Sequence, residues 1–165
     1  MKRILIGAAV AAFAIQAGAG DNYVGAKYGI TSVRDSGLGW DTGSSLGLLY
    51  GYDIPDNDIA IEAEFTTTVS SVDSTGTYGD LDVTTLGVYA VFRNPGTFYF
   101  KGKAGLLYEY LNSSVGPIDV DEAAIVLSLG LGGGIRFNET LSAEIEYTFL
   151  EWDIAFASVG VNYSF

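Results

Sequence analysis

The amino-acid sequence predicts an all-β fold, an eight-stranded antiparallel up-and-down β-barrel whose apolar face is turned outward. The first observation is that apolar and charged or small residues alternate in Ala143–Phe149, Ile59–Thr66 and Phe98–Ala104. Side chains on a strand point to opposite faces with period two, so each segment has one apolar face and one charged face. The second observation is the regular succession of such segments along the chain, and the third is the placement of their glycines.

Eight segments carry a strand pattern, and each is close to the roughly 9–11 residues that a tilted strand needs to cross a bilayer. We expect strands at Tyr23–Ser32, Ser44–Tyr52, Asp58–Val69, Asp82–Arg93, Thr97–Tyr110, Ala124–Phe137, Leu141–Phe149 and Ile154–Phe165.

The connections between these strands alternate in length. Short ones with turn residues are Asp53–Asn57, Asn94–Gly96 and Asn138–Thr140. Longer ones rich in Ser, Gly and Asp are Val33–Gly43, Ser70–Leu81 and Leu111–Ala123, whereas the last hairpin, Leu150–Asp153, is tight. Short turns at one end and longer loops at the other are typical of barrels with periplasmic turns and external loops.

Glycine placement indicates which face is the inner one. Nearly all strand glycines fall on the charged face, and the exceptions are Gly102 and Gly133. The interior of an eight-stranded barrel is only wide enough for side chains to fill it, so the face rich in glycine should be inside and the aromatic face outside. A soluble barrel that carries a ligand would need the reverse arrangement. The pattern therefore favours a transmembrane barrel of the bacterial outer membrane.

The predicted interior carries equal numbers of bases and acids. Charges removed from water persist only when they are paired and hydrogen-bonded, so this balance predicts a network of ion pairs across the lumen. We expect Lys101 and Lys103, with Arg93 and Arg136, to bridge the Glu pairs of the third and seventh strands and to close the pore. A weak ion path between these groups is the alternative. The predicted network consists of Lys27, Glu62, Glu64, Arg93, Lys101, Lys103, Glu109, Arg136, Glu144 and Glu146.

Aromatic residues gather near the strand ends, as two girdles at headgroup level require. We expect the periplasmic girdle to contain Tyr50, Tyr52, Phe92, Phe98, Phe137, Tyr163 and Phe165. We expect the external girdle to contain Phe65, Tyr108, Tyr110, Tyr147 and Phe149.

The start of the chain has the pattern of a secretory signal peptide. Lys2 and Arg3 precede an apolar run, Ile4–Ile15, and small residues follow at Ala17–Ala19. We expect cleavage after Ala19, which leaves residues 20–165 as one barrel domain. The apolar run is too short for a membrane-spanning helix, and the absence of cysteine excludes disulfides and thiolate metal sites.

The final strand, Ala157–Phe165, ends on Phe and has apolar residues at every second position before it. It resembles the terminal strand of bacterial outer-membrane barrels. The mature chain as a whole resembles the small outer-membrane β-barrel proteins that include the outer-membrane protein A membrane domain and the opacity-type proteins. The resemblance implies that Val161, Tyr163 and Phe165 form an assembly signal for the barrel-assembly machinery, with periplasmic chaperones as earlier partners. We expect no peptidoglycan-binding domain after the barrel, so that role is not carried over from the resemblance.

Catalysis is disfavoured by the absence of histidine. Small outer-membrane barrels that are enzymes use a histidine base, and a serine is not readily activated without a positioned base. The Glu pairs, Glu62 with Glu64 and Glu144 with Glu146, are interpreted as ion-pair partners rather than acid/base dyads. We therefore expect no enzyme, no catalytic residue and no cofactor.

Other ligand-binding signals are weak. The acidic segments Asp119–Glu122 and Asp80–Asp82 offer oxygen ligands for Ca²⁺ or Mg²⁺, but acidic loops are usually only solvated, so we assign no metal site. A net charge of −12 disfavours nucleic acid. The expected partners are outer-membrane lipid and lipopolysaccharide, and the expected state is a monomer.

Three functions remain open at this stage. The leading one is a structural or surface-interaction protein that displays its loops outside the cell. The second is a narrow ion channel. The third is an adhesin or ligand binder that uses loop aromatics, for which Trp40, Tyr78 and Trp152 are the candidates.

Overall fold

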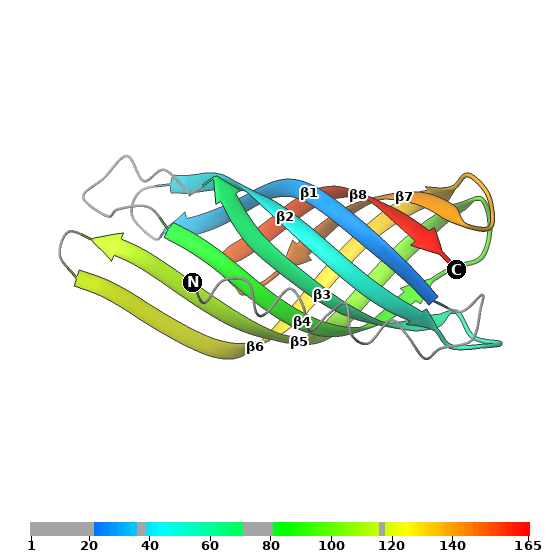
Figure 1. Cartoon of the computed structure of the whole chain (residues 1–165), viewed down its shortest axis with the longest axis horizontal. Helices are drawn as coiled ribbons and strands as arrows, with labels where there is room; N and C mark the ends of the chain where they lie inside the picture. Colours follow the sequence, from blue (N-terminus) through cyan, green and yellow to red (C-terminus); the bar gives the residue numbers. More distant parts are fainter. Residues whose placement is uncertain (1–21, 36–38, 71–80, 116–117) are drawn as a thin grey trace.

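The structure, a computed structural model, describes residues 22–35, 39–70, 81–115 and 118–165, with the backbone alone for residues 33–35, 39–41, 81–82, 111–115 and 118–122. Eight antiparallel strands follow one another in chain order and close into a barrel when β8 pairs with β1 (Figure 1). The strands are β1 (Asn22–Asp35), β2 (Gly39–Asp53), β3 (Ile59–Ser70), β4 (Leu81–Arg93), β5 (Phe98–Val115), β6 (Ile118–Arg136), β7 (Leu141–Phe149) and β8 (Ile154–Ser164). The predicted fold class is confirmed. No helix that is long and apolar enough to cross a bilayer occurs in the part of the chain described.

The barrel has two unlike ends. The turns after β2, β4 and β6 are short and lie together with Asn22 and Phe165, and we call this the turn end (Figure 1). Asp56 with φ 59° and Gly96 with φ 121° adopt the left-handed backbone conformation that these tight turns require. The opposite end carries the hairpins β1–β2, β5–β6 and β7–β8, and we call it the hairpin end.

Two of the predicted external loops are wrong, because most of their residues belong to strands. β1 and β2 stay paired up to Asp35 and Gly39, and β5 and β6 stay paired up to Val115 and Ile118. The Ser, Gly and Asp in these segments favour turns locally, but every second residue pair added to a hairpin forms two ladder hydrogen bonds between the strands. The tips of both hairpins and the predicted loop at residues 71–80 lie outside the described residues.

The assignment of faces is confirmed. Phe98 and Leu127 on the outer face are 75% and 67% exposed, whereas Leu107 on the inner face is 1% exposed. Along β7, the exposed Ile145 and Tyr147 alternate with the buried Glu144 and Glu146. An apolar wall of this extent suits acyl chains, and the buried groups fill the bore.

Inward-facing glycines make room for three buried tyrosines. The ring of Tyr23 lies over Gly51, that of Tyr99 over Gly134, and that of Tyr89 over Gly87. A methyl group added at any of these glycines would overlap the ring. The glycines that indicated the inner face in the sequence therefore make room for the large tyrosine rings of that face.

A charge placed on the outer wall should cost free energy in proportion to its depth. We expect Ile145→Arg, in the middle of β7 on the outer face, to lower the free energy of unfolding by about 2–4 kcal/mol, and Phe137→Arg, at the turn end, by about 0–1 kcal/mol. Urea unfolding in phospholipid vesicles, followed by tryptophan fluorescence, measures both. Equal losses at the two depths would contradict a bilayer around this wall.

Candidate functional site

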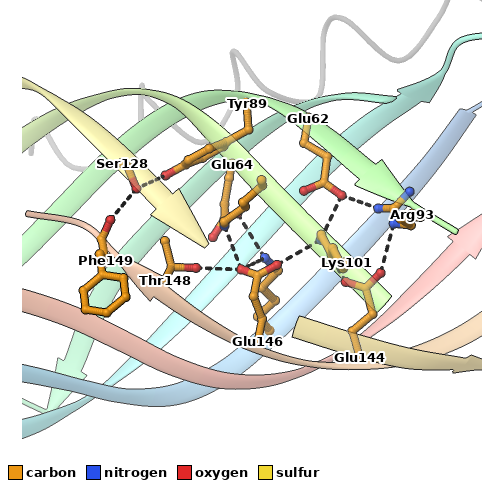
Figure 2. A network of polar contacts seen from close by, with 12 residues as sticks. Glu62, Glu64, Tyr89, Arg93, Lys101, Ser128, Glu144, Glu146, Thr148 and Phe149 are labelled. Carbon is orange, nitrogen blue, oxygen red and sulfur yellow. Dashed lines mark hydrogen bonds and ion pairs between the residues drawn. The ribbon is translucent and has the colours of Figure 1, made fainter. Parts of the chain in front are cut away.

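Buried charged side chains from five strands meet in the lumen. β3 and β7 supply pairs of glutamates, β5 supplies a pair of lysines, and β1 and β4 add one cation each. Within each pair the residues are two positions apart, so the strand period turns both side chains inward. Figure 2 shows the acids of β3 and those of β7 on opposite sides, with Lys101 and Arg93 between them. We call this set the ion network; it consists of Lys27, Glu62, Glu64, Arg93, Lys101, Lys103, Glu144 and Glu146.

The two β5 lysines form the centre of the ion network. Lys101 Nζ lies 3.0 Å from Glu62 Oε1, 2.9 Å from Glu144 Oε2 and 2.9 Å from Glu146 Oε2. Lys103 Nζ lies 2.7 Å from both Glu64 Oε2 and Glu146 Oε1. Each lysine therefore joins the glutamates of β3 to those of β7 across the bore.

Lys27 and Arg93 complete the ion network from the other strands. Lys27 Nζ lies 3.0 Å from Glu64 Oε2 and 2.8 Å from Glu146 Oε1. Arg93 pairs with Glu62, and its Nε lies 3.2 Å from Glu144 Oε1. Asp53, on the rim of the turn end, also lies 3.4 Å from Arg93 Nη1. No carboxylate of the ion network depends on a single cation.

Burial makes this charge balance necessary. The network has four cations and four carboxylates, and its side chains are nearly inaccessible to solvent apart from Arg93, which is 11% exposed. An unpaired charge in such surroundings costs several kcal/mol, whereas matched and hydrogen-bonded pairs offset that penalty. The arrangement therefore holds only while both signs are present together.

Neutral hydroxyl groups bind the same carboxylates, and the sequence analysis did not identify them. Tyr23 donates a hydrogen bond of 2.8 Å to Glu62 Oε1, Tyr99 donates one of 2.7 Å to Glu144 Oε1, and Thr148 donates one of 2.8 Å to Glu146 Oε1. Toward the hairpin end, Tyr89 donates to Ser128 Oγ, which donates to the carbonyl of Phe149 (Figure 2). Strand parity alone places these residues on the inner face, so period two could have identified them.

Aromatic rings also cover two of the four cations of the ion network. The guanidinium of Arg93 lies 4.4 Å from the centre of the Tyr23 ring, and Lys103 Nζ lies 4.3 Å from that of Tyr89. A cation over an aromatic face is attracted by the ring quadrupole, more strongly where water is excluded. The glycines that leave room for the Tyr23 and Tyr89 rings therefore allow these rings to pack directly against the buried cations.

Two residues predicted for the network lie apart from it. Arg136 is at the turn end, where its guanidinium lies 4.2 Å from the centre of the Tyr99 ring and donates hydrogen bonds to the carbonyls of Gly96 and Asn94. Glu109 is buried in the hairpin half of the lumen and forms no ion pair with any described residue. Both residues face inward, as the alternation along their strands predicts, but the alternation does not say at which height along the bore a residue lies.

Different groups occupy the lumen on the two sides of the ion network, toward the hairpin end and toward the turn end. In the hairpin half, Leu107, Leu150, Ile154 and Phe156 form a buried apolar cluster inside the barrel. At the turn end a cavity of about 620 Å³ opens to solvent, lined by Tyr23, Arg93, Tyr99 and Arg136 among others. From the turn end inward, the lumen therefore contains the open cavity, then the ion network, then the apolar side chains. The cavity ends at the ion network.

The chain contains neither histidine nor cysteine. Among the described residues no group of three or more potential metal ligands comes together in a form that could hold an ion. The acidic segments Asp119–Glu122 and Asp80–Asp82 fall outside the described side chains.

Removing one charge from the ion network should destabilise the barrel strongly. We expect Glu146→Gln to lower the free energy of unfolding by about 3–5 kcal/mol, because Lys27, Lys101 and Lys103 all lose a partner. Urea unfolding in phospholipid vesicles gives the value, and Glu139→Gln, in an exposed turn, is the control. A loss as small as that of the control would show that the network is not needed for stability.

Comparison with known proteins agrees with this architecture. Residues 4–165 match the family model described as "Outer membrane protein beta-barrel domain". No curated protein sequence matches the chain.

Several solved structures are similar in fold. Neisserial surface protein A is 19% identical, with a TM-score of 0.73, and the match covers 90% of this chain and 100% of that one. The attachment invasion locus protein Ail of Yersinia pestis is 17% identical, with a TM-score of 0.67 and the same coverage. OprG of Pseudomonas aeruginosa is 14% identical, with a TM-score of 0.62, over 90% and 98% of the two chains. The chain belongs to the outer-membrane β-barrel domain family, whose members lie in the bacterial outer membrane.

Proposed function

We propose that this protein is a structural and surface-interaction protein of the outer membrane, without enzymatic activity, whose closed barrel displays hairpins outside the cell. In this proposal the turn end faces the periplasm and the hairpin end faces outward. We take the monomer as the functional unit, because the barrel closes within one chain.

The filled lumen is the observation that carries the proposal. An ion that entered from the turn end would meet Arg93 and Lys101, each held by glutamates of both β3 and β7. Beyond the ion network it would meet the buried side chains of Leu107 and Phe156. Passage would need several paired charges to separate without water and an apolar layer to open, and both steps are costly.

Unequal strand lengths support the display role. β7 has 9 residues, about the length that crosses a bilayer, whereas β5 has 18 and β6 has 19. All three begin or end near the turn end, so the surplus of β5 and β6 extends past the end of β7 (Figure 1). A rigid paired hairpin presents its residues with less loss of conformational entropy on binding than a loop would.

Of the three loop aromatics considered for ligand contact, Trp152 is described together with its side chain. Trp152, in the tight turn between β7 and β8, is 96% exposed. It follows Phe149 of the external girdle closely, so we place it at the headgroup level, where tryptophan is favoured. Tyr78 and the side chain of Trp40 lie outside what the structure describes, and their role in binding stays a prediction.

Export and assembly complete the proposal. The signal peptide at residues 1–19 lies outside the described residues and would be removed after export. Val161, Tyr163 and Phe165 are exposed on the outer wall at the end of the chain. There they would be available to the barrel-assembly machinery, after periplasmic chaperones, before lipid and lipopolysaccharide cover them.

Planar-bilayer recording tests the closed lumen. We expect the refolded protein to give no steady single-channel steps, because ion pairs and apolar side chains occupy the bore. Steady steps whose size changes in Glu144→Gln or Lys103→Met, but not in Glu139→Gln, would overturn the proposal and establish a narrow channel instead.

A further inference from the structure

The wall of the barrel is incomplete beside β6 at the hairpin end. β6 pairs with β5 along its whole length, from Ile118 opposite Val115 to Ile135 opposite Phe98. Its pairing with β7 begins only at Leu129, opposite Phe149. Within the described part of the chain, residues 118–128 therefore have a neighbouring strand on the β5 side and none on the other. In Figure 1 the β5–β6 hairpin projects beyond the other strands. We call residues 123–127 the free edge, since their side chains are described as well as their backbone.

Hydrogen bonds at the turn end show which backbone groups point to the open side. The Arg136 amide donates to the carbonyl of Thr97, on the β5 side, and the Phe137 amide donates to the carbonyl of Leu141, on the β7 side. Successive residues of an extended strand alternate in this direction, and the register of β6 is continuous. The N–H and C=O groups of residues 123, 125 and 127 therefore point away from β5, toward the opening.

β7 does not return to cover these groups. It ends at Phe149, and the amides of Leu150 and Glu151 both donate to the carbonyl of Ile154, which closes the turn to β8. Backbone groups without partners at a strand edge form a template for another strand. An added strand would satisfy them in alternation, as the ladder elsewhere in the barrel does.

Side chains and charge define what kind of strand would fit. Ile125 is 73% exposed and Leu127 is 67% exposed, both on the outer face. The sequence has no lysine or arginine between Lys103 and Arg136. Glu151 and Asp153 lie in the β7–β8 turn, beside the opening. A partner with alternating basic and apolar residues would match both features.

We propose that the free edge of β6 binds a basic, extended segment of an extracellular polypeptide, which adds to the barrel as an extra antiparallel or parallel strand. This inference rests on the surface-interaction role and on the outward orientation of the hairpin end. It assigns that role to backbone groups of one strand rather than to loop side chains such as Trp152.

A fluorescently labelled octapeptide of alternating lysine and valine is the probe, and its affinity for the protein refolded in nanodiscs is measured by anisotropy. Ile125→Pro removes the donor at the free edge and leaves the β5 ladder intact, because that ladder uses the even-numbered residues. Ile125→Ala keeps the donor and removes most of the side chain. We expect Ile125→Pro to weaken binding by roughly tenfold or more and Ile125→Ala to weaken it much less.

Amide hydrogen exchange gives a second, site-specific measurement. The peptide should slow exchange at residues 123, 125 and 127, and residues 124 and 126 should be protected with or without it. An octapeptide of alternating glutamate and valine should not bind. Equal affinity of the two peptides, equal loss in the Pro and Ala variants, or protection of the amides of residues 123, 125 and 127 without peptide would each overturn the proposal.

These outcomes separate the inference from the proposed function. Single-channel steps in planar bilayers would overturn the closed lumen and leave peptide binding at the edge unaffected. Failure of the peptide to bind a non-conducting barrel would overturn the edge site alone.

Discussion

The constraint on which the whole structure depends is that backbone polar groups cannot be left without partners inside a lipid bilayer. Only a ladder that closes on itself satisfies every strand, and here β8 closes it by pairing with β1 from Tyr23 to Val33. Closure fixes the width of the bore through the number of strands. The side-chain period then sends one half of each strand into a narrow interior and the other half into lipid.

The interior follows from that narrow bore. Space is so limited that glycines such as Gly51 and Gly134 are needed opposite the rings of Tyr23 and Tyr99. The charges that fill the remaining volume are tolerable because each is shared between partners on opposite walls. The same pairing that lets charged residues be buried also blocks the pore, so stability and closure to ions are two results of one arrangement.

Much of this could be predicted from the sequence, because period two fixes the face on which each residue lies. The inward positions of Lys101, Glu62 and Glu146 and the outward position of Leu129 required nothing more. The separation of Glu109 and Arg136 from the ion network could not be predicted, since strand tilt and register decide which inward residues share a height along the bore. The continuation of β5 and β6 beyond the expected loop boundary was also missed, because ladder hydrogen bonds there outweigh local turn preference. The free edge depends on that same difference between the lengths of β6 and β7.

The orientation of the wall is the central claim, and nuclear Overhauser contacts between lipid and protein in nanodiscs test it most directly. With protonated lipid and methyl-labelled protein, acyl-chain methylene protons should contact the methyl groups of Leu129, Ile145 and Val159, which lie on the outer face. The methyl groups of Leu107 and Val91, on the inner face, should show none. Lipid contacts at Leu107 and Val91, with Leu129 and Ile145 in contact with each other across a core, would contradict the account.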